Sequence, residues 1–182
     1  FPTKQSTTMT TVSFTDTDIT NKDILFRQYI SEPLAAQSIS AQIIAFVIRA
    51  AERIEGNNLF TTIDIRLVSY DGSVIRGTLI SMKRDGAEVT TTLTARNNNT
   101  GNSTAITCHS GDRLIFEIGL GGNPADTGGA DHDGDLRIGD IATNDLTAGD
   151  TDTDDDNPYI EFTNDLIFWE DGDISFMNII VK

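Results

Sequence analysis

Short segments in which apolar and polar side chains alternate, separated by turn sequences, constrain this chain more than any other feature. Ile63, Ile65 and Leu67 alternate with their neighbours, and Asp71-Gly72 follows them. Side chains two apart in a strand share a face, so this period predicts a half-buried strand and Asp-Gly predicts a hairpin. A second hairpin signal is Asp85-Gly86. Further strands are predicted at residues 9–14, 74–82, 89–95, 114–118, 159–162, 166–169 and 174–181.

The segment Leu34 to Glu55 fits two periods. As a helix it gathers Ile39, Ile43 and Phe46 on one side, and as a strand it turns Ile39, Ile43 and Val47 inward. Periodicity alone does not separate these alternatives. The strand is favoured because the neighbouring segments are predicted as β and an isolated helix would need its own docking surface.

The length and the spacing of the strands predict a single domain with an all-β fold. A chain of 182 residues is long enough to bury a core without disulfides. Many short strands without a βαβ rhythm indicate a sandwich, and the long connection between Gly119 and Pro158 favours a jelly roll over an immunoglobulin-like layout. We therefore predict a jelly-roll-like β-sandwich at residues 21–182, with an acidic loop at 119–157 and an extended N-terminal arm at 1–20.

The charge of the chain excludes several partners. The formal net charge is −15, from 28 acidic and 13 basic side chains. Such a surface repels nucleic acid and anionic lipid and attracts divalent cations. No apolar run is long enough to span a membrane.

Closely spaced aspartates in the acidic loop predict calcium binding. Carboxylates held near one another repel, and Ca²⁺ offsets this with six to eight oxygen ligands at loose geometry. Asp131, Asp133 and Asp135 have the spacing that opens an EF-hand loop, but Leu136 and Ala142 stand where its glycine and its bidentate glutamate belong, so an EF-hand is rejected. The predicted ligands are Asp126, Asp131, Asp133, Asp135, Asp140, Asp150, Asp152, Asp154 and Asp156.

The alternative is a solvated acidic loop without a bound cation. Apolar residues within the loop argue against simple disorder, because they could anchor it to the sandwich. These residues are Leu136, Ile138, Ile141 and Leu146.

No catalytic motif is present, so the chain is predicted not to be an enzyme. Nucleophile, phosphate-loop and dinucleotide motifs are absent. His109 and His132 do not have zinc-site spacing, and Cys108 is expected to be a small buried hydrophobe. A glycosidase needs only two carboxylates, for which Glu117 and Glu161 are the candidates.

Two features suggest an extracellular protein. The chain begins at Phe1 without an initiator methionine, as a processed secreted product would. The stretch Asn97 to Thr104 is predicted as a hairpin tip, with glycosylation sequons at Asn98 and Asn102.

The N-terminal arm contains one polar, β-prone strand. Val12 and Phe14 lie two apart and would enter one face, whereas Met9 has the opposite parity. Such an arm can pair with the open sheet edge of a neighbouring copy as a donor strand, or fold back onto its own sandwich.

Five segments carry a resemblance to other proteins: Phe26–Leu34 (FRQYISEPL), Gln37–Glu52, Asp71–Leu79 (DGSVIRGTL), Gly111–Gly119 (GDRLIFEIG) and Asn157–Phe162 (NPYIEF). Together they resemble a group of β-rich proteins from environmental and phage-associated sequences, for which the resemblance implies a domain type but no activity. A looser analogy, which rests on the architecture and the N-terminal arm, is to secreted jelly-roll subunits that build microbial surface filaments by strand donation.

The function predicted first is a non-catalytic, calcium-binding subunit of an extracellular filament or a virion. It would polymerise head to tail with copies of itself by donating its N-terminal strand. The first alternative is a calcium-dependent carbohydrate-binding module with a cleft lined by Trp169 or Tyr159. The second is a glycan-active enzyme.

Overall fold

A computed structural model describes residues 10–15, 20, 22–122, 133–138, 144–147 and 156–169. The regular elements of this part of the chain are all strands. They are β1 (Thr10–Phe14), β2 (Lys22–Ile30), β3 (Gln37–Ile39), β4 (Ile43–Glu52), β5 (Leu59–Val68), β6 (Ile75–Arg84), β7 (Thr94–Asn102), β8 (Ile106–Cys108), β9 (Arg113–Gly122), β10 (Gly134–Ile138), β11 (Asn144–Asp145), β12 (Asp156–Asn157) and β13 (Tyr159–Phe162). None of the described residues forms a helix of the length and apolarity that a membrane span requires.

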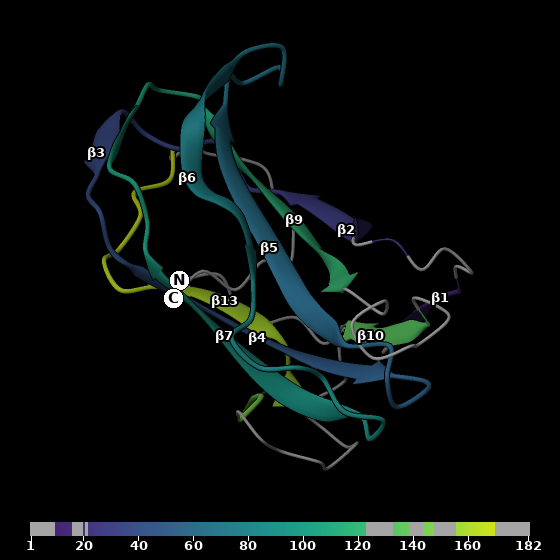
Figure 1. Ribbon diagram of the computed structural model, residues 1–182. Coiled ribbons are helices and arrows are strands. Elements are labelled where there is room, and N and C mark those ends of the chain that lie inside the picture. Colours follow the sequence, from purple (N-terminus) through teal and green to yellow (C-terminus); the bar gives the residue numbers. More distant parts are fainter. Residues whose placement is uncertain are drawn as a thin grey trace.

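The larger strands form two antiparallel sheets that face each other (Figure 1). Sheet A has the order β1-β10-β4-β13, with β7 along the other edge of β4, and sheet B has the order β2-β9-β5-β6. In sheet A, β10 pairs with Arg49–Glu52 and β13 pairs with Ile44–Val47. These two strands therefore follow each other along one edge of β4, whereas β7 runs along the opposite edge.

The strand pairs are nested in the manner of a jelly roll. β5 pairs with β6 at the centre of the chain, and outward from it β4 pairs with β7, β3 with β8, β2 with β9 and β1 with β10. The chain is thus a folded ribbon that wraps so that β9 meets β5 in sheet B and β10 meets β4 in sheet A. The predicted all-β, jelly-roll-like sandwich is confirmed.

The main core lies between the two sheets. Ile44, Phe46 and Ile48 of β4 and Phe116 of β9 are all buried there. The rings of Phe116 and Phe162 cross edge to face with centroids 6.4 Å apart, an arrangement that aromatic pairs favour. This contact joins the middle of sheet B to sheet A.

The segment from Leu34 to Glu55, which fitted both a helix and a strand, forms strands β3 and β4. The face of β4 that was predicted to point inward was wrong. Ile44, Phe46 and Ile48 face the main core, whereas Ile43 is 46% exposed and Val47 lies on the outer face. Val47 is nevertheless buried, because Leu146 and Tyr159 cover it there. A strand buried on both faces has no clear two-residue period, which explains the ambiguity.

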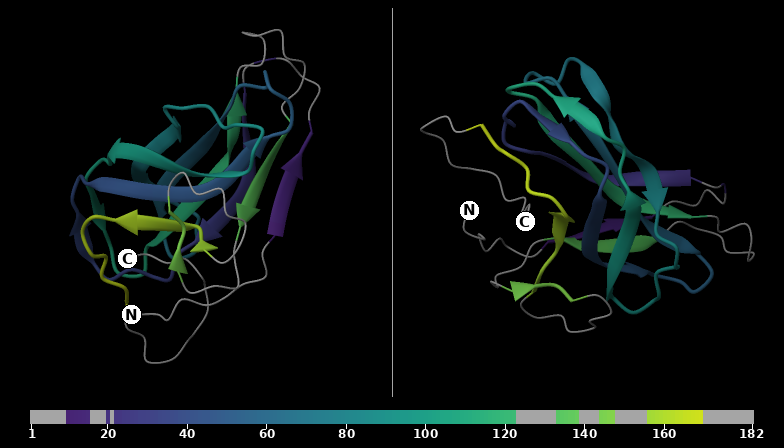
Figure 2. Two further views of the ribbon diagram at one scale, coloured as in Figure 1. Left: turned by 90° about the horizontal axis from the view of Figure 1, so that it is seen from below. Right: turned by 90° about the vertical axis from the view of Figure 1, so that its left-hand side faces the viewer.

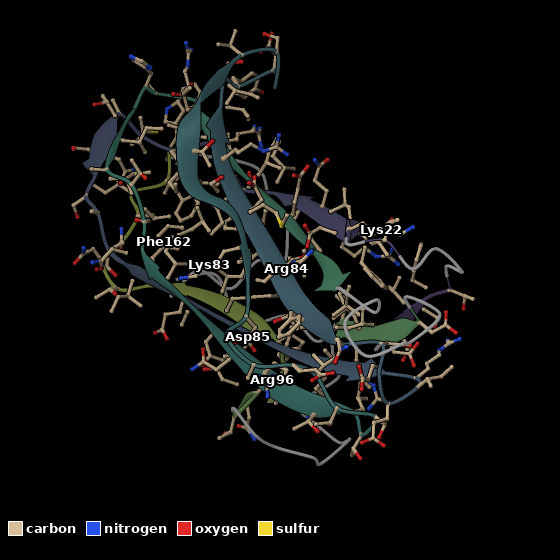
Figure 3. All side chains as sticks on the ribbon, viewed as in Figure 1. Lys22, Lys83, Arg84, Asp85, Arg96 and Phe162 are labelled. Atoms are coloured by element: carbon tan, nitrogen blue, oxygen red, sulfur yellow. The ribbon has the colours of Figure 1, made fainter. Side chains whose placement is uncertain are left out.

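The connection from β6 to β7 also differs from the prediction. Asp85-Gly86 does not open a tight hairpin, and the strand predicted at 89–95 is β7, which begins at Thr94. Val89 is buried in an irregular segment, where its backbone N–H donates to the Leu59 carbonyl at 2.8 Å. Arg96 and Asp85, labelled in Figure 3, hold this segment through a contact of 2.8 Å.

The predicted acidic loop is interrupted by strands, because residues 119–157 include the end of β9 and all of β10, β11 and β12. Leu136 is 0% exposed in the main core and Leu146 is 1% exposed against Val47. Both residues therefore anchor this region to sheet A.

Candidate functional site

The terminal strand β1 is the outermost strand of sheet A and lies beside β10 (Figure 2, left). The pairing is antiparallel and runs from Thr10 opposite Ile138 to Phe14 opposite Gly134. Val12 and Phe14 are half-buried against the core, and the Phe14 ring meets that of Phe26 with centroids 5.9 Å apart. In this structure the arm is thus paired within its own chain, which is the alternative to donation.

The outermost strands of the two sheets differ in how their edges are protected. β2, at the edge of sheet B, has a bulge between Leu25 and Arg27, and its Asp23 and Arg27 side chains are exposed. Bulges and charges are the usual means by which sheet edges avoid pairing with other chains. The sequence of β1, Thr-Thr-Val-Ser-Phe, contains no charge and no proline, and its register with β10 is regular. Among the described residues, no further strand pairs with the outer edge of β1, and neither a charge nor a bulge in β1 blocks such pairing.

Two of the predicted calcium ligands, Asp133 and Asp135, stand at the start of β10. Oδ1 of Asp135 accepts hydrogen bonds from the Arg53 guanidinium at 3.0 and 3.3 Å, and this contact raises the pKa of Arg53. The Asp133 carbonyl accepts from the Arg53 backbone N–H at 2.9 Å and from Nδ2 of Asn57 at 3.0 Å. Oδ1 of Asp133 is buried and has no hydrogen-bond partner among the described residues.

The structure does not place the other predicted calcium ligands beside Asp133 and Asp135. Asp156 begins β12, and its side chain is not described. Asp126, Asp131, Asp140, Asp150, Asp152 and Asp154 lie outside the described residues, as does Met9 of the arm. Within the described ranges, no three histidine, cysteine, aspartate or glutamate side chains converge on a metal position.

The outer face of sheet B carries a shallow depression of about 200 Å³. Its charged lining consists of Asp23, Asp64 and Glu117, and Leu25 and Met82 are its most exposed apolar residues. Sequence reasoning singled out only Glu117 of these, because carboxylates from three different strands share no sequence motif.

The carboxylates of this depression are held by basic and amide groups. Arg66 contacts both Glu117 and Asp64, the latter at 2.9 Å, and Arg84 contacts Asp23 at 2.7 Å. Gln28 donates to Glu117 at 2.7 Å, and the Met82 backbone N–H donates to Asp64 at 3.0 Å. This network offsets the charges of the three carboxylates at the surface.

The glutamate pair considered for glycan hydrolysis does not form. Glu117 is in β9 of sheet B, where it pairs with Asp64, whereas Glu161 is in β13 of sheet A, where it pairs with Ala45. Glu117 lines the outer face of sheet B, and Glu161 alternates with Ile160 and Phe162, whose side chains face the core. The two side chains therefore point to opposite outer faces of the sandwich.

The remaining predicted positions are separated from one another. Asn98 and Asn102 are in β7 opposite Phe46 and Ile43, not at a hairpin tip, and Asn102 is exposed. Tyr159 packs on the outer face of sheet A, whereas Trp169 lies near Gly111 in the turn between β8 and β9. The two aromatic residues therefore do not line one cleft.

Cys108 is buried, as expected of a small hydrophobe. Burial, and then the nearby Asp112 carboxylate, raise the pKa of its thiol to about 11. The thiolate is the reactive form of cysteine, so this side chain is inert near neutral pH. His109 contacts Asp112 at 3.4 Å through Nδ1, and His132 lies outside the described residues.

No family model and no curated protein sequence matches the chain. Among solved structures, that of the infectious bursal disease virus Gx strain is similar with a TM-score of 0.37 and 12% identity, over 72% of this chain and 31% of that one. The infectious bursal disease virus VP2 subviral particle has a TM-score of 0.29 and 15% identity, over 72% of this chain and 32% of that one. The chain thus spans about a third of the length of those proteins. Likenesses this weak carry no argument about function, and the resemblance to environmental and phage-associated proteins stays a prediction.

Proposed function

We propose that the chain is a non-catalytic structural subunit that assembles with copies of itself outside the cell, in a filament or a virion. The observation that carries this proposal is β1, an uncharged strand that pairs with one neighbour among the described strands, with Val12 and Phe14 against the core. The assembly contact would be the exchange of this strand between copies.

Strand exchange between copies costs little free energy, because the same contacts form between two copies as within one chain. A β1 strand from a neighbour has the same sequence, so it makes the same backbone hydrogen bonds with β10 and the same ring contact with Phe26. If each copy passes its arm to the next, one end of the chain of subunits keeps a free arm and the other keeps an open edge. The contact then repeats and builds a fibre.

The length of the connection between β1 and β2 limits how far β1 can reach toward a neighbouring copy. From Phe14 to Lys22 the backbone reaches at most about 28 Å when fully extended. The β10 edge of the receiving copy must therefore lie within that distance of Lys22, at the start of β2. This favours a contact between subunits on the side of the sandwich where β1 and β2 lie.

A cysteine pair across β1 and β10 tests the exchange directly. Ser13 lies opposite Asp135, and both side chains are on the outer face of sheet A. In an S13C/D135C variant, paired strands should form a disulfide, because directly opposite residues in an antiparallel pair have the required separation. Cys108 should not compete, since it is buried and its pKa is raised to about 11.

Donation predicts a ladder of covalent multimers on a non-reducing denaturing gel, and pairing within one chain predicts only a monomer of altered mobility. Loss of the Arg53–Asp135 contact should cost little, because the two side chains are 40% and 26% exposed. The single variant S13C is the matched control and should give no ladder.

Deletion of the arm provides a second test. A chain lacking residues 1–15 should remain a soluble β-sandwich and form no filaments, because sheet B and most of sheet A are kept. A peptide of residues 8–14 added in trans should bind it, and a V12D/F14D peptide should not. Filaments of unchanged form from the truncated chain, or cross-linked monomer alone under assembly conditions, would contradict strand exchange.

Calcium is proposed as a stabiliser of the region around β10. The buried Oδ1 of Asp133 supports this, because it has no hydrogen-bond partner among the described residues and a cation would satisfy it. Calcium that binds only the folded chain should raise the melting temperature relative to chelator, and D133A should reduce that rise more than D133N. A rise that D133A leaves unchanged would show that Asp133 is not a ligand, and equal protection by magnesium would indicate a nonspecific charge effect.

A further inference from the structure

Two aromatic side chains lie exposed beside each other at the end of the sandwich where β5 turns into β6. Tyr70 is 61% exposed and Trp169 is 46% exposed. A Cβ placed on Gly111 would lie 3.7 Å from Cδ2 of Tyr70 and 3.8 Å from Cζ3 of Trp169. The two rings therefore flank Gly111, whose missing side chain leaves the surface between them open.

The segments that carry these rings are fixed by backbone hydrogen bonds. The Gly111 N–H donates to the Leu34 carbonyl at 2.8 Å, and the Trp169 N–H donates to the Pro33 carbonyl at 2.8 Å. Leu34 and Pro33 thus hold Gly111 and Trp169 next to each other. Tyr70 belongs to a turn in which the Gly72 N–H donates to the Ser69 carbonyl at 2.8 Å. The backbone that carries the two exposed rings is therefore held by hydrogen bonds.

Arg113 adds a cation to this aromatic pair. Its Cζ atom lies 4.9 Å from the centroid of the Tyr70 ring, and NH1 donates to the Ser31 carbonyl at 2.9 Å. Within the described part of the chain, no carboxylate lies within ion-pair distance of Arg113. The nearby Asp112 is instead held by Arg76 at 3.2 Å. In a chain of net charge −15, an arginine without a carboxylate is available to an anionic ligand.

We propose that Tyr70, Trp169 and Arg113 form a binding site for an acidic sugar residue. The C–H face of a pyranose ring would lie on the aromatic rings, and its carboxylate would accept hydrogen bonds from the Arg113 guanidinium. An entirely apolar partner would leave the arginine N–H groups unpaired, and a neutral sugar would leave its charge unused. A long polyanion would be repelled by the net charge of the chain, so the ligand has one acidic unit.

The sole tryptophan of the chain reports on this site, because Trp169 is the only one present. We would titrate the full chain at 0.15 M salt with matched pairs of oligosaccharides, sialyllactose against lactose and an aldouronic acid against the corresponding xylooligosaccharide. The acidic member of at least one pair should change Trp169 fluorescence saturably and bind at least about tenfold more tightly than its neutral partner.

Three variants assign the contacts. Y70A should weaken binding of the acidic sugar about tenfold or more, and R113Q should abolish the preference for the acidic member of the pair. R27Q, which removes an exposed arginine of β2, is the matched control and should bind like the parent chain. If loss of the contact with Ser31 unfolds R113Q, R113K keeps the charge and should show a smaller preference.

The proposal is overturned if neither acidic sugar changes the fluorescence, if each neutral partner binds as tightly, or if Y70A and R113Q bind like the parent. It is also overturned if the fluorescence depends on protein concentration without sugar, since the patch would then be a contact between copies. Deleting residues 1–15 should leave sugar binding unchanged, so failure of strand exchange and failure of this site are distinguishable.

Discussion

On the outer face of sheet B, the charges of Asp23, Asp64 and Glu117 meet arginines that remain partly exposed, whereas Arg49 on the outer face of sheet A is 0% exposed. Arg49 has at least one polar or electrostatic partner in the chain. A buried charge requires such a partner, because removing it from water costs several kcal/mol. The outer face of sheet A is therefore covered by further parts of its own chain around Val47 and Arg49. The charged groups on the outer face of sheet B stay in partial contact with solvent.

The two sheets also differ in where their strands come from. In sheet B, β2, β5, β6 and β9 all lie within residues 22–122. Sheet A is completed by β1, β10 and β13, which all lie outside that range. Sheet A is consequently the sheet whose edge can be exchanged between copies. We expect its stability to depend more on single contacts than that of sheet B.

The largest difference between the sheets should appear at Arg49. We expect R49A to lower the free energy of unfolding by about 3–5 kcal/mol, because it leaves a cavity where a large, fully buried side chain packed and removes that side chain's polar interaction. R49M should cost less, since it fills the same space. Urea denaturation followed by circular dichroism measures both values.

R84Q on sheet B is the matched control for this comparison. The Arg84–Asp23 pair is more than a quarter exposed on both sides, at 28% and 27%, so its loss should cost about 0–1 kcal/mol. Equal losses for R49A and R84Q would show that burial does not distinguish the two sheets.

The next largest difference should lie at the sheet edges. F14A removes a half-buried ring that contacts Phe26, and we expect it to cost about 1–2 kcal/mol and to weaken assembly. L25A on β2 is the control, because Leu25 is 56% exposed and its loss should change stability little. Denaturation and sedimentation velocity separate the two effects. If L25A impaired assembly and F14A did not, the contact would lie on β2.

The fold could be predicted from sequence where a strand has one face in the core and one face toward solvent. Ile63, Ile65 and Leu67 of β5 are core residues that alternate with Asp64 and Arg66 on the outer face, so the period is visible in the sequence. β4 has apolar residues on both faces because Leu146 covers Val47, so the period fails. The jelly roll could still be inferred from the number of strands and the long late connection.

The candidate sites could be predicted less well, because they join residues that are far apart in sequence. Parity placed Val12 and Phe14 on one face of the arm, but no local signal identified β10 as their partner. Tyr70 and Gly111 lie in two separate turns and meet Trp169 of the segment after β13, and Arg113 is recognised only by its position over the Tyr70 ring. Arg49 carried one signal that was missed, a charged residue within the apolar run from Phe46 to Ala51.

The smallest expected difference concerns a carboxylate of sheet A, Glu52. It is 3% exposed, and burial raises its pKa above the usual 4.5, with a further rise from Glu88 and Glu55. Hydrogen bonds from the backbone N–H groups of Leu59, at 3.5 Å, and of Asn58 lower the pKa but do not offset the effect of burial. The folded chain therefore holds the Glu52 proton more tightly than the unfolded chain does.

A raised carboxyl pKa gives stability that is fully present below pH 4.5 and is lost as the pH rises through the raised value. E52Q keeps a neutral side chain at every pH. It should therefore match the parent chain at pH 4 and exceed it at pH 7, by on the order of 0.5 kcal/mol, in paired urea denaturations. E161Q, on the partly exposed outer face of β13, is the control for the general loss of one negative charge. A gain for E52Q that is already present at pH 4, or one that E161Q reproduces at pH 7, would mean that net charge and not burial of Glu52 sets the difference.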